Sequence, residues 1–184
     1  MFVKIDFRNK YDFNFASNDY RVRSFQAELK DGSPMDLYVK IDKQPHELLP
    51  NVYNMAFGPL NRKGQVDGQI QLAYQNYSRV FSTILWSANL YLSRNRDHFI
   101  GIDGSDNRRA HMYYKLLQRN YDYFHKHFRI YGIKYYVRIT RFGKHQYDDP
   151  FDFEDVQYIR SPIEKNDETP YPMFNYFVFN LKYN

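Results

Sequence analysis

Residues 98–114 read HFIGIDGSDNRRAHMYY, an apolar run that stops at a Gly-Ser turn and is followed at once by a helical pattern. Phe99–Ile102 is predicted to be a strand, and the helix is predicted to continue to about residue 128. Gly104 permits the tight backbone turn between the two elements. This junction is where the sequence alone most clearly suggests a functional site, because the first amide groups of a helix can bind an anion.

The sequence on either side of this junction predicts an α+β fold. Apolar residues recur every three or four positions over about 77–94, which predicts a second long helix. Alternating or aromatic-rich segments predict strands at residues 2–8, 20–30, 35–42, 51–60, 134–141 and 173–183. We therefore expect a mainly antiparallel sheet with two principal helices, about 77–94 and 106–128, packed on one face.

Length and composition predict a single domain over residues 1–184. Hydrophobic residues make up 43% and charged residues 26%, as in ordinary globular proteins. The charge is uneven: residues 94–144 hold 12 Lys/Arg and 4 Asp/Glu, whereas residues 146–170 hold 2 Lys/Arg and 8 Asp/Glu. We expect an acidic, proline-containing loop region at about 143–172 beside a basic surface.

The composition also excludes several classes of protein. The chain contains no cysteine, which rules out disulfides, thiolate metal sites and a cysteine nucleophile, and which fits a reducing compartment. It starts without a signal-peptide pattern, and its apolar runs are shorter than the roughly 20 residues of a membrane span. We therefore expect a cytoplasmic protein that makes no contact with a membrane.

The turn after Phe99–Ile102 is a candidate anion site. The polar residues at 105–107 can cap the following helix, and its free amide groups then lie beside Arg109. Gly104, Ser105 and Arg109 are the candidate ligand-binding residues on this argument. The alternative is that Ser105 only caps the helix, while Arg109 pairs with a neighbouring aspartate.

Three segments resemble an uncharacterised bacterial family of unknown function, of the kind found in Bacteroidetes. VYNMAFG at residues 52–58 matches Tyr-Asn-x-Ala-Phe-Gly, and Gly104-Ser105 followed by Arg109 and Tyr113 matches Gly-Ser-x-x-x-Arg-x-x-x-Tyr. The third segment is a predicted helix that contains Ser82-Thr83-Ile84. The resemblance covers roughly residues 50–135 and adds Tyr113 to the candidate ligand-binding residues. His111 stands where the family pattern has a second arginine, which argues against a two-arginine site. The resemblance implies no established activity.

A second candidate site is a basic stripe on the helix predicted at 106–128. Its members, offered as nucleic-acid-binding residues, are Arg108, Lys115, Arg119 and Lys126. Aromatic residues make up 20% of the chain. They either fill the sheet or form a stacking surface for bases, for which exposed tyrosines such as Tyr135 or Tyr136 would serve.

These patterns favour a binding module without enzymatic activity, whose ligand is nucleic acid or another polyanion. One alternative is a protein-interaction component, either a homodimer or a toxin–antitoxin-like partner, that uses the aromatic C-terminal strand as a free edge. Another is an enzyme acting on a phosphorylated or carboxylated small molecule at Ser105 and Arg109. The chain lacks a phosphate-loop, hydrolase-elbow or nucleotidyltransferase pattern, and its histidines are scattered. We therefore predict no catalytic residue, no metal ligand and no cofactor.

Overall fold

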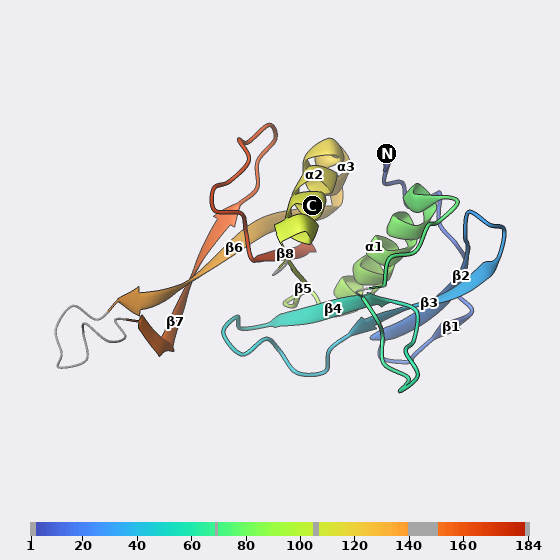
Figure 1. Ribbon diagram of the computed structural model, residues 1–184, viewed down its shortest axis with the longest axis horizontal. Coiled ribbons are helices and arrows are strands. Elements are labelled where there is room, and N and C mark those ends of the chain that lie inside the picture. Colours follow the sequence, from blue (N-terminus) through green and yellow to red (C-terminus); the bar gives the residue numbers. More distant parts are fainter. Residues whose placement is uncertain (1–2, 69, 105–106, 140–150, 183–184) are drawn as a thin grey trace.

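The computed structural model describes residues 3–68, 70–104, 107–139 and 151–182, in which eight strands form one mixed sheet and three helices cover one face of it (Figure 1). The helices are α1 (Tyr77–Arg94), α2 (Asn107–Arg119) and α3 (Tyr121–His127). The strands are β1 (Phe15–Ala16), β2 (Val22–Glu28), β3 (Pro34–Ile41), β4 (Val52–Gly58), β5 (Phe99–Asp103), β6 (Phe128–Ile139), β7 (Phe151–Pro162) and β8 (Tyr176–Leu181). The predicted α+β class is confirmed.

The order of strands across the sheet is β1-β2-β3-β4-β5-β8-β6-β7. The first four strands pair antiparallel with their neighbours in sequence. β4 and β5 are parallel, and α1 supplies the crossover that a parallel pair requires. β8 pairs antiparallel with both β5 and β6. The expectation that the C-terminal strand offers a free edge is therefore wrong, because both of its sides are hydrogen-bonded.

The helix predicted at 77–94 is confirmed by α1. The side chain of Asn76 caps it by accepting a hydrogen bond of 2.9 Å from the backbone N–H of Arg79. The apolar face of α1 packs on the sheet within the main core, which also contains Phe177 and Phe179 of β8. Val178, between those two residues, belongs to a smaller core cluster on the opposite face of the sheet. Among the described residues, no helix combines the length and hydropathy of a membrane span.

The helical segment predicted at 106–128 is confirmed in its extent, but a break at Asn120 divides it into α2 and α3, and β6 begins at Phe128. Asn120 is 7% exposed, and its side-chain amide binds the N-terminal segment of the chain instead of solvent. Phe128 then adopts an extended conformation, and β6 continues through a run rich in aromatic and β-branched residues that favours a strand.

The strand predicted at 2–8 is wrong. Residues 3–11, which we call the N-terminal strap, run between α1 and the α2–α3 unit and, among the described residues, pair with no strand. Side chains bind the backbone of the strap instead. The N–H of Ile5 donates to Oδ1 of Asn120 at 2.8 Å, and Nδ2 of Asn120 donates to the carbonyl of Val3 at 2.9 Å. The side-chain amide of Asn120 thus makes two hydrogen bonds to the backbone of the strap that a paired strand would otherwise make.

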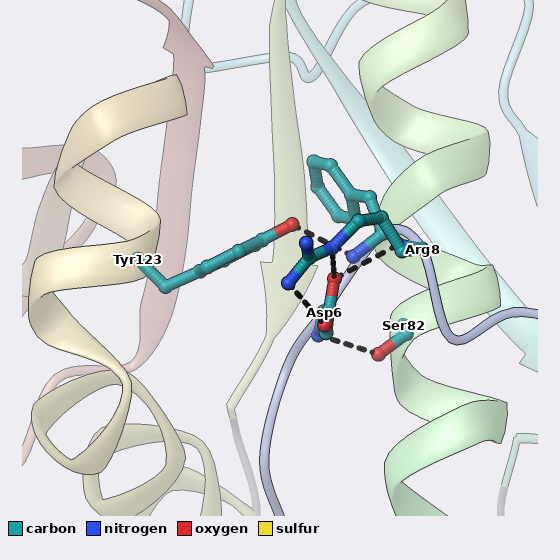
Figure 2. Close-up of polar contacts among 5 residues, drawn as sticks. Asp6, Arg8, Ser82 and Tyr123 are labelled. Atoms are coloured by element: carbon teal, nitrogen blue, oxygen red, sulfur yellow. Dashed lines mark hydrogen bonds and ion pairs between the residues drawn. The ribbon is translucent and has the colours of Figure 1, made fainter.

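Further along the strap, hydroxyl groups from two different helices supply the acceptors. The N–H of Asp6 donates to Oγ of Ser82 on α1 at 3.0 Å, and the N–H of Phe7 donates to the hydroxyl of Tyr123 on α3 at 2.7 Å. Figure 2 shows Ser82 and Tyr123 reaching the strap from opposite sides. The strap is therefore a bridge between the two helical units.

The acidic loop predicted at 143–172 is wrong in its middle part, because residues 151–162 form β7. Residues 140–150 lie outside the described part of the chain. β8 pairs with β6 only as far as Ile133, so the rest of β6 pairs with β7 alone and forms a two-stranded arm that extends beyond the sheet (Figure 1). Residues 163–172 contain no strand, as expected.

Replacing Asn120 with alanine should lower the free energy of unfolding by about 2–4 kcal/mol, because the buried backbone groups of Ile5 and Val3 lose their partners. Urea denaturation followed by circular dichroism measures this change. Ser78→Ala is the matched control, since its hydroxyl accepts only the exposed N–H of Lys4 and its removal should cost less. Equal costs for the two variants would contradict the role given to Asn120.

Candidate functional site

Three of the four residues of the predicted basic stripe are exposed on α2. The exposed residues on the solvent side of α2 follow one another at helical spacing: Arg108, His111, Met112, Lys115 and Arg119. The helix contains no aspartate or glutamate. Its opposite side is buried in the core. We call Arg108, Lys115 and Arg119, together with the exposed Lys126 of α3, the basic face.

An acidic segment packs along one flank of this basic face. The hydroxyl of Tyr114 donates to the carbonyl of Asp167 at 3.1 Å, and Nε2 of Gln118 donates to the carbonyl of Glu164 at 2.7 Å. The hydroxyl of Tyr121 donates to a carboxylate oxygen of Glu164 at 2.7 Å. Tyr114 and Gln118 directly precede two cations of the basic face in sequence. The acidic segment, residues 164–168, is therefore bound to residues of α2 that are adjacent in sequence to Lys115 and Arg119.

Gly104 has a structural role in the turn that precedes α2. It is buried, and its N–H donates to the carbonyl of Asn175 at 2.8 Å. A Cβ atom at this position would lie only 3.0 Å from the ring of Phe177. Tyr113 packs on the same ring with an edge-on geometry and is 9% exposed. Ser105, the next residue of the predicted anion site, lies outside the described residues.

The structure thus brings Gly104 and Tyr113 together in the core. Arg109 is half-buried near the start of α2 and is engaged with other groups. The packing accounts for Gly104 and Tyr113 without a ligand. Binding of an anion by Gly104, Ser105, Arg109 and Tyr113 stays a prediction.

A cleft of about 470 Å³ lies between β3, β4 and the loop that joins them. Its walls are formed by Lys40, Asp42, Lys43, Gln44, Pro45, His46 and Asn54. This volume is within the range of sites for small molecules. We call it the sheet cleft. The sequence gives no signal for it, because its walls come from residues with no recognisable motif.

His46 is held in the cleft wall by hydrogen bonds at both ring nitrogens. The N–H of Leu48 donates to Nδ1 at 3.1 Å, so the ring proton of the neutral form is on Nε2. Nε2 lies 3.2 Å from the hydroxyl of Tyr135 on β6 and donates to it. Burial lowers the pKa of His46 and raises the pKa of Tyr135 to about 12. Both groups are therefore uncharged at neutral pH.

Asn54 is oriented by Tyr176, whose side chain reaches across the neighbouring strand β5. The hydroxyl of Tyr176 on β8 donates to Oδ1 of Asn54 on β4 at 3.0 Å, although β5 lies between these two strands. The tyrosine ring passes over Gly101, where a Cβ atom would lie 2.2 Å from it. Burial raises the pKa of Tyr176 above its ordinary value. A glycine inside an apolar strand is the one sequence signal for this contact.

The chemistry of the cleft suits binding better than catalysis. Lys40, Lys43 and the amide nitrogen of Asn54 are donors, and Asp42 is an acceptor. Both nitrogens of His46 are occupied, so this residue is not placed to act as a general base. Within the described part of the chain, no three His, Asp or Glu side chains converge as a metal site would require.

Comparison with known proteins places this chain in a family. A family model described as a family of unknown function (DUF6934) matches residues 8–153. The matched region includes the sheet cleft, α1 and the basic face, and it ends before β8. No curated protein and no solved structure matches the chain.

Gly101→Ala should lower the free energy of unfolding by about 1–3 kcal/mol, because the added methyl group overlaps the ring of Tyr176 and displaces it from Asn54. Thermal and urea denaturation measure the effect. Gly68→Ala is the matched control, since a Cβ atom there meets its nearest neighbour at an ordinary 3.5 Å. A stability equal to that of the control would show that the ring does not depend on Gly101.

The free energy of unfolding should fall as the pH is lowered from about 7 to 5, and His46→Gln should reduce this dependence. Burial lowers the pKa of His46 below its usual 6.5, so the unfolded chain takes up the proton at a higher pH than the folded chain. Stability is therefore lost below the unfolded pKa. His98 and His127, whose pKa values burial also lowers, contribute the remaining dependence.

Urea denaturation at several pH values provides the measurement. The exposed His111 is the control position, and His111→Gln should leave the dependence as it is in the wild-type protein. An unchanged pH dependence in His46→Gln would be inconsistent with a buried, neutral His46.

Proposed function

The chain belongs to DUF6934, a family of unknown function, and we propose that it is a binding protein for a polyanion, with nucleic acid as the ligand. The observation that carries the proposal is the basic face. Arg108, Lys115 and Arg119 project from one side of a helix that has no acidic residue. The role proposed for these cations is to contact phosphate groups.

The dimensions of the basic face suit a nucleic-acid backbone. Arg108 and Arg119 are eleven residues apart on α2, which corresponds to about 16 Å along the helix axis at 1.5 Å per residue. This length corresponds to roughly five nucleotides at 3.4 Å each. Several phosphate groups can therefore be bound at once. Interactions with phosphates carry little sequence information, so we expect weak sequence preference.

Of the two tyrosines that the sequence suggests for stacking, Tyr136 is better placed than Tyr135. It is 48% exposed on the β6–β7 arm, whereas the hydroxyl of Tyr135 is bound to His46. Alternation along β6 puts Tyr136 on the same sheet face as Gly132, which is covered by the core residue Phe174 and lies on the helix side. Tyr136 therefore faces the same side of the sheet as the helices.

Removal of the basic face should weaken binding and reduce its dependence on salt. We expect a mixed-sequence oligonucleotide to bind with micromolar affinity at about 50 mM salt and much more weakly at about 200 mM. Arg108→Ala/Lys115→Ala/Arg119→Ala should lower the affinity and reduce the slope of log K against log salt by about 0.9 for each phosphate that is no longer neutralised. Fluorescence polarisation with single- and double-stranded oligonucleotides measures both quantities.

Arg62→Ala/Lys63→Ala is the charge control, because both residues are exposed in the loop between β4 and α1. This variant should bind like the wild-type protein. Equal reductions of affinity in the two variants would show that binding depends on the net charge of the protein and not on the basic face. Absence of binding at both salt concentrations would refute the proposal.

A second candidate function is assembly with a protein partner through β7. This strand is at one edge of the sheet and pairs with β6 alone. Ile159 and Tyr158 are 53% and 38% exposed on it, which is the kind of apolar edge that another strand can extend. Gel filtration of the wild-type protein and of Ile159→Lys tests this function: a dimer that the variant does not form supports it, and a wild-type monomer counts against self-assembly.

A further inference from the structure

Two arginines from different elements meet at one tyrosine ring. The guanidinium carbon of Arg23 on β2 lies 4.7 Å from the centre of the Tyr20 ring, and that of Arg94 at the end of α1 lies 3.9 Å from it. Arg94 is exposed, whereas Arg23 is 1% exposed. In the described ranges of the chain, neither guanidinium has a carboxylate partner. Two positively charged side chains therefore contact the same aromatic ring.

The hydrogen bonds of Arg23 are incomplete. Its Nη1 donates to the carbonyl of Tyr20 at 2.9 Å and to the carbonyl of Ser87 at 3.0 Å. Among the residues that the structure describes, its Nη2 has no acceptor, and Oγ of Ser87, which is also buried, has no partner either. A buried charge with an unused donor carries a desolvation cost that a bound ligand can offset. The open hydrogen-bonding groups therefore lie on two residues that already touch.

Arg23 keeps its positive charge despite this burial. Burial lowers its pKa to about 10, and the charge of Arg94 acts in the same direction. The side chain is still protonated at neutral pH. Asp19, the nearest acidic residue in sequence, accepts hydrogen bonds from Oγ of Ser17 at 2.6 Å and from the N–H of Arg21 at 3.2 Å. Its carboxylate is thus used within the turn.

Tyr20 is held in a strained backbone conformation above Arg23. Its φ angle is 62°, in the left-handed region that a bulky side chain rarely adopts. The N–H of Tyr20 donates to the carbonyl of Ser17 at 2.9 Å, and its own carbonyl accepts from Arg23. Such strain is kept where the surroundings impose it, and it frequently occurs at ligand sites. A movement of Tyr20 would release the strain and open the way to both guanidinium groups.

We propose that Arg23 and Arg94 form a binding site for a small molecule with an oxyanion group, phosphate or carboxylate, and that Tyr20 covers this site. The oxyanion accepts hydrogen bonds from Nη2 of Arg23 and from the guanidinium of Arg94, and the hydroxyl of Ser87 donates to it. The ring of Tyr20 moves away as the ligand enters. This site is formed by β2 and α1 and is independent of the basic face.

The probes are inorganic phosphate and acetate, compared with chloride at equal ionic strength. We expect phosphate or acetate to raise the melting temperature of the wild-type protein above its value in chloride. Arg94→Met should weaken the binding of the active probe about tenfold or more, because it removes a charge-assisted hydrogen bond. Arg94 is exposed, so this variant keeps the fold. Isothermal titration calorimetry gives the dissociation constants.

Tyr20→Gly should tighten binding about fivefold or more, because glycine adopts the left-handed conformation without strain and leaves the site uncovered. A merely structural tyrosine would not give tighter binding when removed. Arg79→Met is the matched control: this arginine of α1 also stacks on a tyrosine, Tyr11 at 4.1 Å, but its Nε donates to the carbonyl of Lys10. The control should bind the probe like the wild-type protein.

Each outcome decides the proposal. Binding of phosphate alone assigns the site to phosphate groups, and binding of both probes extends it to carboxylates. Stabilisation that chloride matches, or that Arg94→Met retains, would overturn the proposal, and so would no stabilisation by either probe. The triple variant of the basic face should keep the effect, so failure of the nucleic-acid proposal and failure of this one are separable.

Discussion

Backbone groups of a partly buried segment that pairs with no strand need other hydrogen-bond partners, and the two helical units of this structure are joined by meeting that requirement in the N-terminal strap. Because no strand of the described chain pairs with the strap, Asn120 and hydroxyl groups of α1 and α3 supply the partners. Asn120 serves the strap at the point where α2 ends and α3 begins. The break in the helix and the docking of the strap therefore meet at one residue.

Two glycines in the sheet each make room for an aromatic ring from the C-terminal part of the chain. Tyr176 lies over Gly101, and Phe174 lies over Gly132, where a Cβ atom would be 2.3 Å from the ring. In both cases a ring from the C-terminal part of the chain occupies space that an ordinary residue of β5 or β6 would fill. Part of the high aromatic content thus links neighbouring strands within the protein, as strand packing would lead one to expect.

Local patterns in the sequence predicted the elements whose contacts are local. α1 was predictable because its cap and its apolar stripe lie within the helix itself, and the exposed positions of Arg108, Lys115 and Arg119 on α2 agree with their helical spacing. The break at Asn120 was not predictable, because the apolar spacing continues across it and its partner Ile5 is 115 residues away. The Arg23–Arg94 pair escaped for the same reason, since it joins segments that are distant in sequence. The sheet cleft lies within residues 40–54, and it escaped because these residues form no recognisable motif.

The position of β8 has a consequence for the order in which the fold can assemble. β8 lies between β5 and β6, although it follows both of them in the chain. During synthesis, β5 and β6 therefore leave the ribosome before the strand that joins them, and each exposes an open edge until residues 176–181 emerge. The exposed edges of this interval, rather than those of the finished sheet, are where a newly made chain is most open to wrong pairing.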